Sequence, residues 1–128
     1  MSSLILEKKH ETLGWTEEQV TGVLDEVLQR LVALRPDRIV LFGSWAWGEP
    51  KAESDIDLYI VTGEEEMPES WAEKSRIYQR YARVIHDLQG KMPIDLLVHT
   101  RAMHRKFMER GGSFAQEIQQ KGQVLYEA

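Results

Sequence analysis

Cysteine is absent from the 128-residue chain. Without thiols, the chain forms neither a disulfide framework nor a cysteine-based zinc site. A domain of this length buries enough apolar surface to fold without either kind of crosslink. The lack of cysteine is compatible with a reducing compartment, and we expect a cytoplasmic protein stabilised by its hydrophobic core.

Long hydrophobic runs are also missing. No apolar segment approaches the ~20 residues that a membrane-spanning helix needs. The N-terminus carries one short apolar patch, Leu4–Leu6, before charged residues begin, whereas a signal peptide has an apolar run of roughly 7–15 residues. We therefore expect no membrane association, a tail or contact arm at residues 1–15, and a single domain at residues 16–128.

A surplus of basic residues is missing too. Sixteen lysines and arginines face twenty-one aspartates and glutamates, which gives a net charge of −5. Nucleic-acid-binding domains usually carry a basic footprint, so we expect no nucleic-acid partner. Net charge leaves room for a local basic groove. The basic cluster between Arg101 and Arg110 fits either a solvated helix face or a surface for nucleotide phosphates or an acidic partner.

Hydrophobic periodicity predicts four helices and four strands. Capping-box patterns at Thr16–Gln19, Ser70–Glu73 and Ser113–Gln116 mark three helix starts, and Pro36 ends the first helix. The helices are expected at residues 16–35, 70–88, 101–109 and 113–120, and the strands at residues 39–42, 56–61, 94–98 and 123–126. Helices that alternate with strands indicate an α/β or α+β fold in which helices cover a sheet.

The predicted helix at residues 70–88 carries a largely aromatic stripe. Residues at helical spacing are expected to form its inner face: Trp71, Tyr78, Tyr81, Ile85 and Leu88. Aromatic members of this set that were exposed together would instead indicate a surface for a protein partner.

Two acidic residues stand at the entrance of an otherwise apolar strand. Side chains on a strand alternate between its faces, so Asp55 and Asp57 point the same way and Ile56 points to the opposite side. Two carboxylates on one face repel each other unless a cation lies between them, and rigidly held oxygen ligands suit Mg²⁺. Asp95 lies within another predicted strand. If the two strands pair, three carboxylates converge, enough to hold two metal ions roughly 4 Å apart.

A Gly-Ser turn precedes these acids. Gly43 permits a tight turn and a close approach of the backbone to a ligand. Ser44 offers a hydroxyl, and the segment after it presents amides at a helix N-terminus, which attract phosphate groups. Metal-binding carboxylates beside a phosphate-holding turn indicate nucleotide chemistry that works by positioning and charge neutralisation.

Gly43-Ser44, ten further residues and Asp55-x-Asp57, with Asp95 in a later strand, resemble the signature of the DNA polymerase β-type nucleotidyltransferase superfamily. The similarity extends from the first predicted strand to the third. Within the superfamily the chain most resembles the minimal nucleotidyltransferases (the MNT family), which lack the extra domains of polymerases. The resemblance implies a polymerase β-like fold, with a small mixed β-sheet and helices packed mainly on one face.

The resemblance also implies an activity. Minimal nucleotidyltransferases encoded beside a HEPN-domain toxin act as antitoxins that transfer AMP from ATP to a tyrosine of the toxin. ATP as substrate, two Mg²⁺ ions as cofactors and a HEPN toxin as partner are therefore implied here. By the same resemblance, Gly43 and Ser44 hold the triphosphate, and Asp55 and Asp57 ligate both metals. Asp95 ligates the second metal and helps to deprotonate the attacking hydroxyl.

Trp47 departs from the family pattern, because many relatives carry Arg at this position. Lys51 in the same loop is a substitute source of charge. Trp47 is expected to pack in the core, with stacking on a base as the alternative. Two other functions stay open: an antibiotic adenylyltransferase that acts on an aminoglycoside hydroxyl, and a non-catalytic antitoxin that neutralises its partner by contact alone.

His99 follows Asp95 on the same predicted strand face. It is either a fourth ligand or proton carrier, or a strand-end residue without a role in the site, and we favour the strand-end interpretation. Three further histidines show no ligand spacing and are expected at the surface: His10, His86 and His104.

Overall fold

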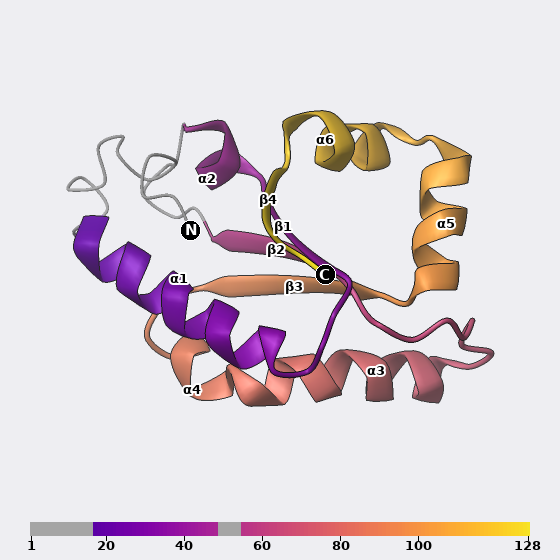
Figure 1. Cartoon of the computed structure of the whole chain (residues 1–128), viewed down its shortest axis with the longest axis horizontal. Coiled ribbons are helices and arrows are strands. Elements are labelled where there is room, and N and C mark those ends of the chain that lie inside the picture. Colours follow the sequence, from indigo (N-terminus) through magenta and orange to yellow (C-terminus); the bar gives the residue numbers. More distant parts are fainter. Residues whose placement is uncertain (1–16, 49–54) are drawn as a thin grey trace.

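The computed structural model describes residues 17–48 and 55–128, and a mixed four-stranded sheet lies at its centre (Figure 1). The strands are β1 (Arg38–Phe42), β2 (Ile56–Val61), β3 (Ile94–His99) and β4 (Gln123–Glu127). Their order in the sheet is β3-β2-β1-β4. β1 pairs antiparallel with β2 and with β4, whereas β2 and β3 run parallel. The predicted strands and the mixed sheet are therefore confirmed.

The described part of the chain contains six helices. They are α1 (Glu17–Val32), α2 (Ser44–Trp47), α3 (Trp71–Val84), α4 (His86–Gln89), α5 (Arg101–Arg110) and α6 (Ser113–Lys121). The prediction of one continuous helix at residues 70–88 is wrong. Ile85 has φ −119° and ψ 9°, outside the helical region, and separates α3 from α4. None of the described helices is long and apolar enough to cross a membrane.

The main core lies between the sheet and the helices α1, α3 and α4 (Figure 1). Every second residue of a strand points into this core, including Ile56, Leu58 and Ile60 of β2. A stripe at helical spacing on α1 packs against them: Val20, Leu24, Val27 and Leu31. A smaller cluster on the other face joins Tyr59 to Ile118 of α6 and Phe107 of α5. Helices thus pack mainly on one face, as the resemblance implied.

The helix starts agree only in part with the capping-box predictions. Ser70 caps α3, because its Oγ accepts a hydrogen bond from the Glu73 amide at 3.2 Å. The prediction for α6 is wrong: its N-cap is Gly112 and no side chain caps it. Ser113 is the first helical residue and not the N-cap, and Gln116 donates from Nε2 to the Gly111 carbonyl at 2.9 Å. Thr16 lies outside the described residues.

The inner face of α3 also differs from the prediction. Tyr81 and the Ile85 that follows are buried as expected, but Trp71 is 81% exposed and Tyr78 is 36% exposed. Ile77 occupies the inner position instead, four residues before Tyr81. Adjacent helical residues differ by about 100° in direction, so Tyr78 points well away from the Ile77 stripe, and Trp71, seven residues earlier, shares the direction of Tyr78. Both aromatic side chains therefore face outward.

Candidate active site

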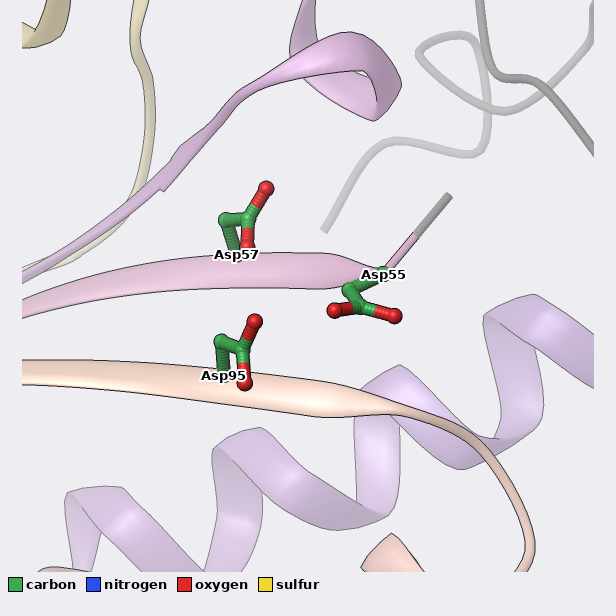
Figure 2. Close-up of side chains that lie close together, drawn as sticks. All are labelled: Asp55, Asp57 and Asp95. Atoms are coloured by element: carbon green, nitrogen blue, oxygen red, sulfur yellow. The ribbon is translucent and has the colours of Figure 1, made fainter. Parts of the chain in front are cut away.

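Three aspartates meet at one end of the neighbouring strands β2 and β3 (Figure 2). Asp57 and Asp95 are register partners in the parallel pair, and Asp55 directly precedes β2. One carboxylate oxygen of each aspartate lies within 4.8 Å of the others. The alternation along β2 places these acids on the face opposite to the buried Ile56. The structure thus brings together the three acids singled out in the sequence.

The crowding of the carboxylates disfavours the charged forms of Asp57 and Asp95. Burial, followed by repulsion from Asp95 and Asp55, raises the pKa of Asp57 to about 6. The pKa of Asp95 is also raised, first by a side-chain hydrogen bond with Asp55 and then by burial. A cation between the carboxylates relieves this repulsion, and an all-oxygen donor set at this spacing fits Mg²⁺. The residues present therefore fit a hard divalent ion.

The Gly-Ser turn lies beside the acids. Gly43 directly follows β1 and has φ +76°, in the left-handed region that favours glycine. A Cβ at this position would clash with Oδ2 of Asp57 and lie 3.3 Å from its Cγ. The β1–β2 register explains the closeness, because it pairs Phe42 with Asp57. Ser44 begins α2 immediately after Gly43, so the first residue of this helix directly follows the glycine that approaches Asp57.

Trp47 does not pack in the core, contrary to the prediction. Its side chain is 39% exposed, whereas Trp45, two residues earlier, is 3% exposed and fills the core position. The ammonium of Lys121, at the end of α6, lies 5.3 Å from the centroid of the Trp47 ring. A cation therefore lies beside Trp47, at the position for which the family resemblance implies Arg. No sequence pattern predicts the contact between Lys121 and Trp47, and the expected substitute, Lys51, lies outside the described residues.

His99 stands apart from the acids, at the end of β3. Its Nδ1 lies 3.0 Å from the Tyr59 hydroxyl, and Nδ1 of His104 lies 2.8 Å from the same oxygen. Burial lowers the pKa of His99 to about 4. Within the described ranges, the group of side chains that could hold a metal ion comprises the three aspartates and no histidine. The strand-end interpretation of His99 therefore agrees with the structure.

The surface prediction for His104 is wrong, because its ring turns inward to the buried Tyr59. Sequence periodicity could not reveal this contact, since it joins a helix residue to a strand residue far away in the chain. His86 is exposed as expected. His10 lies outside the described residues.

The basic cluster between Arg101 and Arg110 divides into two kinds of residue. Arg101 binds Asp37 through two hydrogen bonds of 2.6 and 2.9 Å, and Arg105 forms an ion pair with Glu65. The ion pairs found among residues 17–48 and 55–128 do not include Lys106 or Arg110. Arg101 and Arg105 therefore form ion pairs within the fold, whereas Lys106 and Arg110 are available to solvent or to a ligand.

Comparison with known proteins decides the family. Residues 24–128 match the model of the family described as Polymerase beta, Nucleotidyltransferase. The chain belongs to this nucleotidyltransferase family. Proteins of this family transfer nucleotidyl groups and typically use a nucleotide and a divalent metal ion. The carboxylate cluster agrees with the use of a metal ion.

Individual proteins also resemble this nucleotidyltransferase. The protein named Putative protein adenylyltransferase MJ0141, from Methanocaldococcus jannaschii, is 29% identical over 82 residues, which cover 64% of this chain and 78% of that protein. The crystal structure of a putative nucleotidyltransferase from Sulfolobus solfataricus aligns with 99% of this chain and 89% of its own, at 17% identity and a TM-score of 0.47. The second likeness is too loose to support a conclusion about fold or function.

Proposed function

We propose that this nucleotidyltransferase transfers AMP from ATP to a hydroxyl group of a partner protein. The observation that carries the proposal is the convergence of Asp55, Asp57 and Asp95 beside the Gly43 turn. Acids at this spacing hold cations, and the adjoining turn offers a place for the phosphates that those cations neutralise. The protein adenylyltransferase name of the Methanocaldococcus jannaschii relative supports AMP as the transferred group and a protein as the acceptor.

Each residue then has a role in positioning or proton transfer. Asp55 and Asp57 would each ligate both of two Mg²⁺ ions. Asp95 would ligate the second ion only. The bound ions would supply charge neutralisation for the phosphates. Gly43 and Ser44 hold the triphosphate against the acid cluster. Asp95, the most exposed of the three acids, receives the proton of the acceptor hydroxyl.

The reaction is an in-line displacement at the α-phosphorus of ATP. The acceptor oxygen forms a bond to that phosphorus, and the bond from phosphorus to the bridging oxygen breaks. Pyrophosphate leaves with the bonding electrons, and AMP remains on the acceptor. The chain needs no covalent intermediate of its own for this reaction, so its contribution is orientation and electrostatic stabilisation.

We infer that the acceptor is a tyrosine of a HEPN-domain toxin, which makes this protein an antitoxin in a two-protein complex. The resemblance to minimal nucleotidyltransferases supports this partner. The exposed aromatic residues Trp71 and Tyr78 on α3 are consistent with a surface for a protein partner.

The test incubates the purified protein with ATP labelled at the α-phosphate, Mg²⁺ and a HEPN-type protein as the proposed partner. We expect label on a tyrosine of that protein, loss of label with Asp57→Asn, and full labelling with the exposed control Asp25→Asn. Neutralisation of the toxin by Asp57→Asn without label would show an antitoxin that acts by contact alone. Label on an aminoglycoside and on no protein would contradict the protein acceptor.

A further inference from the structure

β3 forms a free edge of the sheet, because it pairs with β2 alone in the described part of the chain. Backbone groups alternate in direction along a strand. The carbonyls of Pro93 and His99 accept hydrogen bonds from β2 and the residue after it, at 2.9 and 2.8 Å, so odd-numbered residues of β3 turn their backbone toward β2. The N–H and C=O groups of Leu96 and Val98 therefore point to the free edge.

One side chain closes the beginning of this edge. Gln89 donates from Nε2 to the Ile94 carbonyl at 2.8 Å. The free edge thus starts at Leu96, the residue directly after Asp95. A strand added here would form its first backbone hydrogen bond with Leu96, next to Asp95, the most exposed acid of the cluster.

A groove runs along the same edge. Two hollows of about 390 and 420 Å³ adjoin each other, because they share the lining residues Lys74, Leu97, His99 and Met103. We call them together the β3 groove. α3 runs alongside β3 and α5 follows its C-terminal end (Figure 1). The exposed Trp71 and Tyr78 of α3, which the sequence placed in the core, line one hollow.

The second hollow combines apolar surface with positive charge. Phe107 and Phe114 contribute rings in edge-to-face contact, 5.8 Å apart. Three cations line it: Lys74, Lys106 and Arg110. The ion pairs of the described residues include none of the three. In a chain with a net charge of −5, this is a local concentration of cations without acidic partners.

We propose that an extended acidic segment of the acceptor protein binds in the β3 groove as an added strand and so presents its hydroxyl group to Asp95. The inference rests on the proposed transfer to a protein. The free N–H and C=O groups of Leu96 and Val98 bind the backbone of the segment. Its apolar side chains contact Trp71 and Tyr78, and its acidic side chains pair with Lys106 and Arg110.

Strand addition also explains how the hydroxyl reaches the site. Side chains directly across from each other on neighbouring strands lie about 5 Å apart. A hydroxyl-bearing side chain across from Asp95, on the same face of the sheet, therefore enters the space beside the acid cluster. Its neighbours along the segment then point alternately toward the cations of the groove and toward α3.

The experiment uses a bead library of blocked nonapeptides with a central tyrosine and randomised flanks, probed with the fluorescently labelled full chain. We expect selected peptides to be enriched in aspartate and glutamate. Their affinity should fall by about tenfold or more for the double variant Lys106→Glu/Arg110→Glu, and should be unchanged for the exposed control Arg83→Glu. In an added strand, only every second peptide amide donates a hydrogen bond to β3. N-methylation of those amides should abolish binding, whereas N-methylation of the intervening amides should leave binding intact.

Several results would overturn the proposal. These are selection without acidic enrichment, equal affinity for the charge-reversed double variant, and equal effects of N-methylation on the two sets of amides. Displacement of the peptides by a single-stranded RNA of about twelve nucleotides, lost with the same double variant, would assign the groove to nucleic acid instead. Labelled ATP and Mg²⁺ separate the two proposals. Selected peptides that bind by these criteria but accept no AMP support the docking site and contradict the proposed transfer.

Discussion

Gly43 lies so close to Asp57 that a Cβ at position 43 fits only if the Asp57 carboxylate moves. Two separate features of the fold produce this contact: the φ of +76° at Gly43 and the β1–β2 register that pairs the preceding Phe42 with Asp57. The contact fixes the proposed phosphate-binding turn against the proposed metal-binding acid. The relative position of the two is therefore part of the fold and does not depend on a ligand.

Gly43→Ala tests this contact. The added methyl group clashes with Oδ2 of Asp57 and also strains the positive φ, so we expect a loss of about 2–4 kcal/mol in the free energy of unfolding and nearly complete loss of AMP transfer. Gly111→Ala is the matched control, because Gly111 has φ +61° with open space around it. It should lose about 1 kcal/mol through backbone strain alone. Equal losses in urea unfolding of the two variants would refute the contact.

Asp57→Asn should stabilise the protein when divalent ions are removed by EDTA. The pKa of Asp57 is raised to about 6, so its charge opposes folding increasingly as the pH rises from about 4 through 6. We expect a gain of about 1–2 kcal/mol at pH 8, after allowance for solvent screening, and a smaller gain at pH 5. Urea unfolding at both pH values measures it. Asp25→Asn should show no such gain, and a destabilised Asp57→Asn would argue against mutual repulsion among the acids.

His99 should make stability fall in mild acid. Its pKa is lowered to about 4 by burial, so the unfolded chain takes up a proton first as the pH drops below 6.5. His104, whose pKa is also lowered by burial, acts in the same direction. Between pH 7 and 4.5, His99→Asn should lose about 1–2 kcal/mol less than the wild type, because asparagine keeps a polar group near the Tyr59 hydroxyl and does not titrate.

The control for this pH dependence is His86→Asn, which changes an exposed histidine and should follow the wild-type curve. Chemical unfolding at pH values between 7 and 4.5 gives the comparison. Identical losses in the wild type and in His99→Asn would show that another group controls the acid sensitivity.

Lys121→Met should weaken ATP binding. The ammonium of Lys121 lies over the ring of Trp47, at the end of the helical turn that begins with Ser44. Removal of this cation should raise the KM for ATP by about three- to tenfold, with little change in kcat, since the charge attracts the nucleotide before reaction. Lys91→Met, at an exposed position after α4, is the control. An unchanged KM in Lys121→Met would exclude Lys121 as the substitute for the missing arginine.

The strands and the acid cluster could be predicted from the sequence because their signals are local. The run from Ile56 to Val61 is apolar apart from Asp57, and alternation alone places Asp55 and Asp57 on one face. Asp95 required one further assumption, that its strand pairs with β2, and the structure shows this pairing.

Other features could not be predicted because they depend on tertiary packing. Helical spacing predicted an inner face of α3 that includes Tyr78, and only the position of the sheet decides that Ile77 is buried and Tyr78 is not. Trp47 meets Lys121 because α6 ends near α2, a contact between distant parts of the chain. The exposed aromatic residues on α3 and the cation beside Trp47 are therefore findings of the structure, and both concern binding.

The most direct measurement of the central claim is the rate of AMP transfer from labelled ATP to the acceptor by the wild type and by three single variants, Asp55→Asn, Asp57→Asn and Asp95→Asn. If the three carboxylates form one catalytic centre, each variant should lose activity by about a thousandfold or more, while Asp25→Asn retains it. Thermal unfolding checks that every variant is folded. Transfer at the wild-type rate by a folded Asp57→Asn variant would contradict the account.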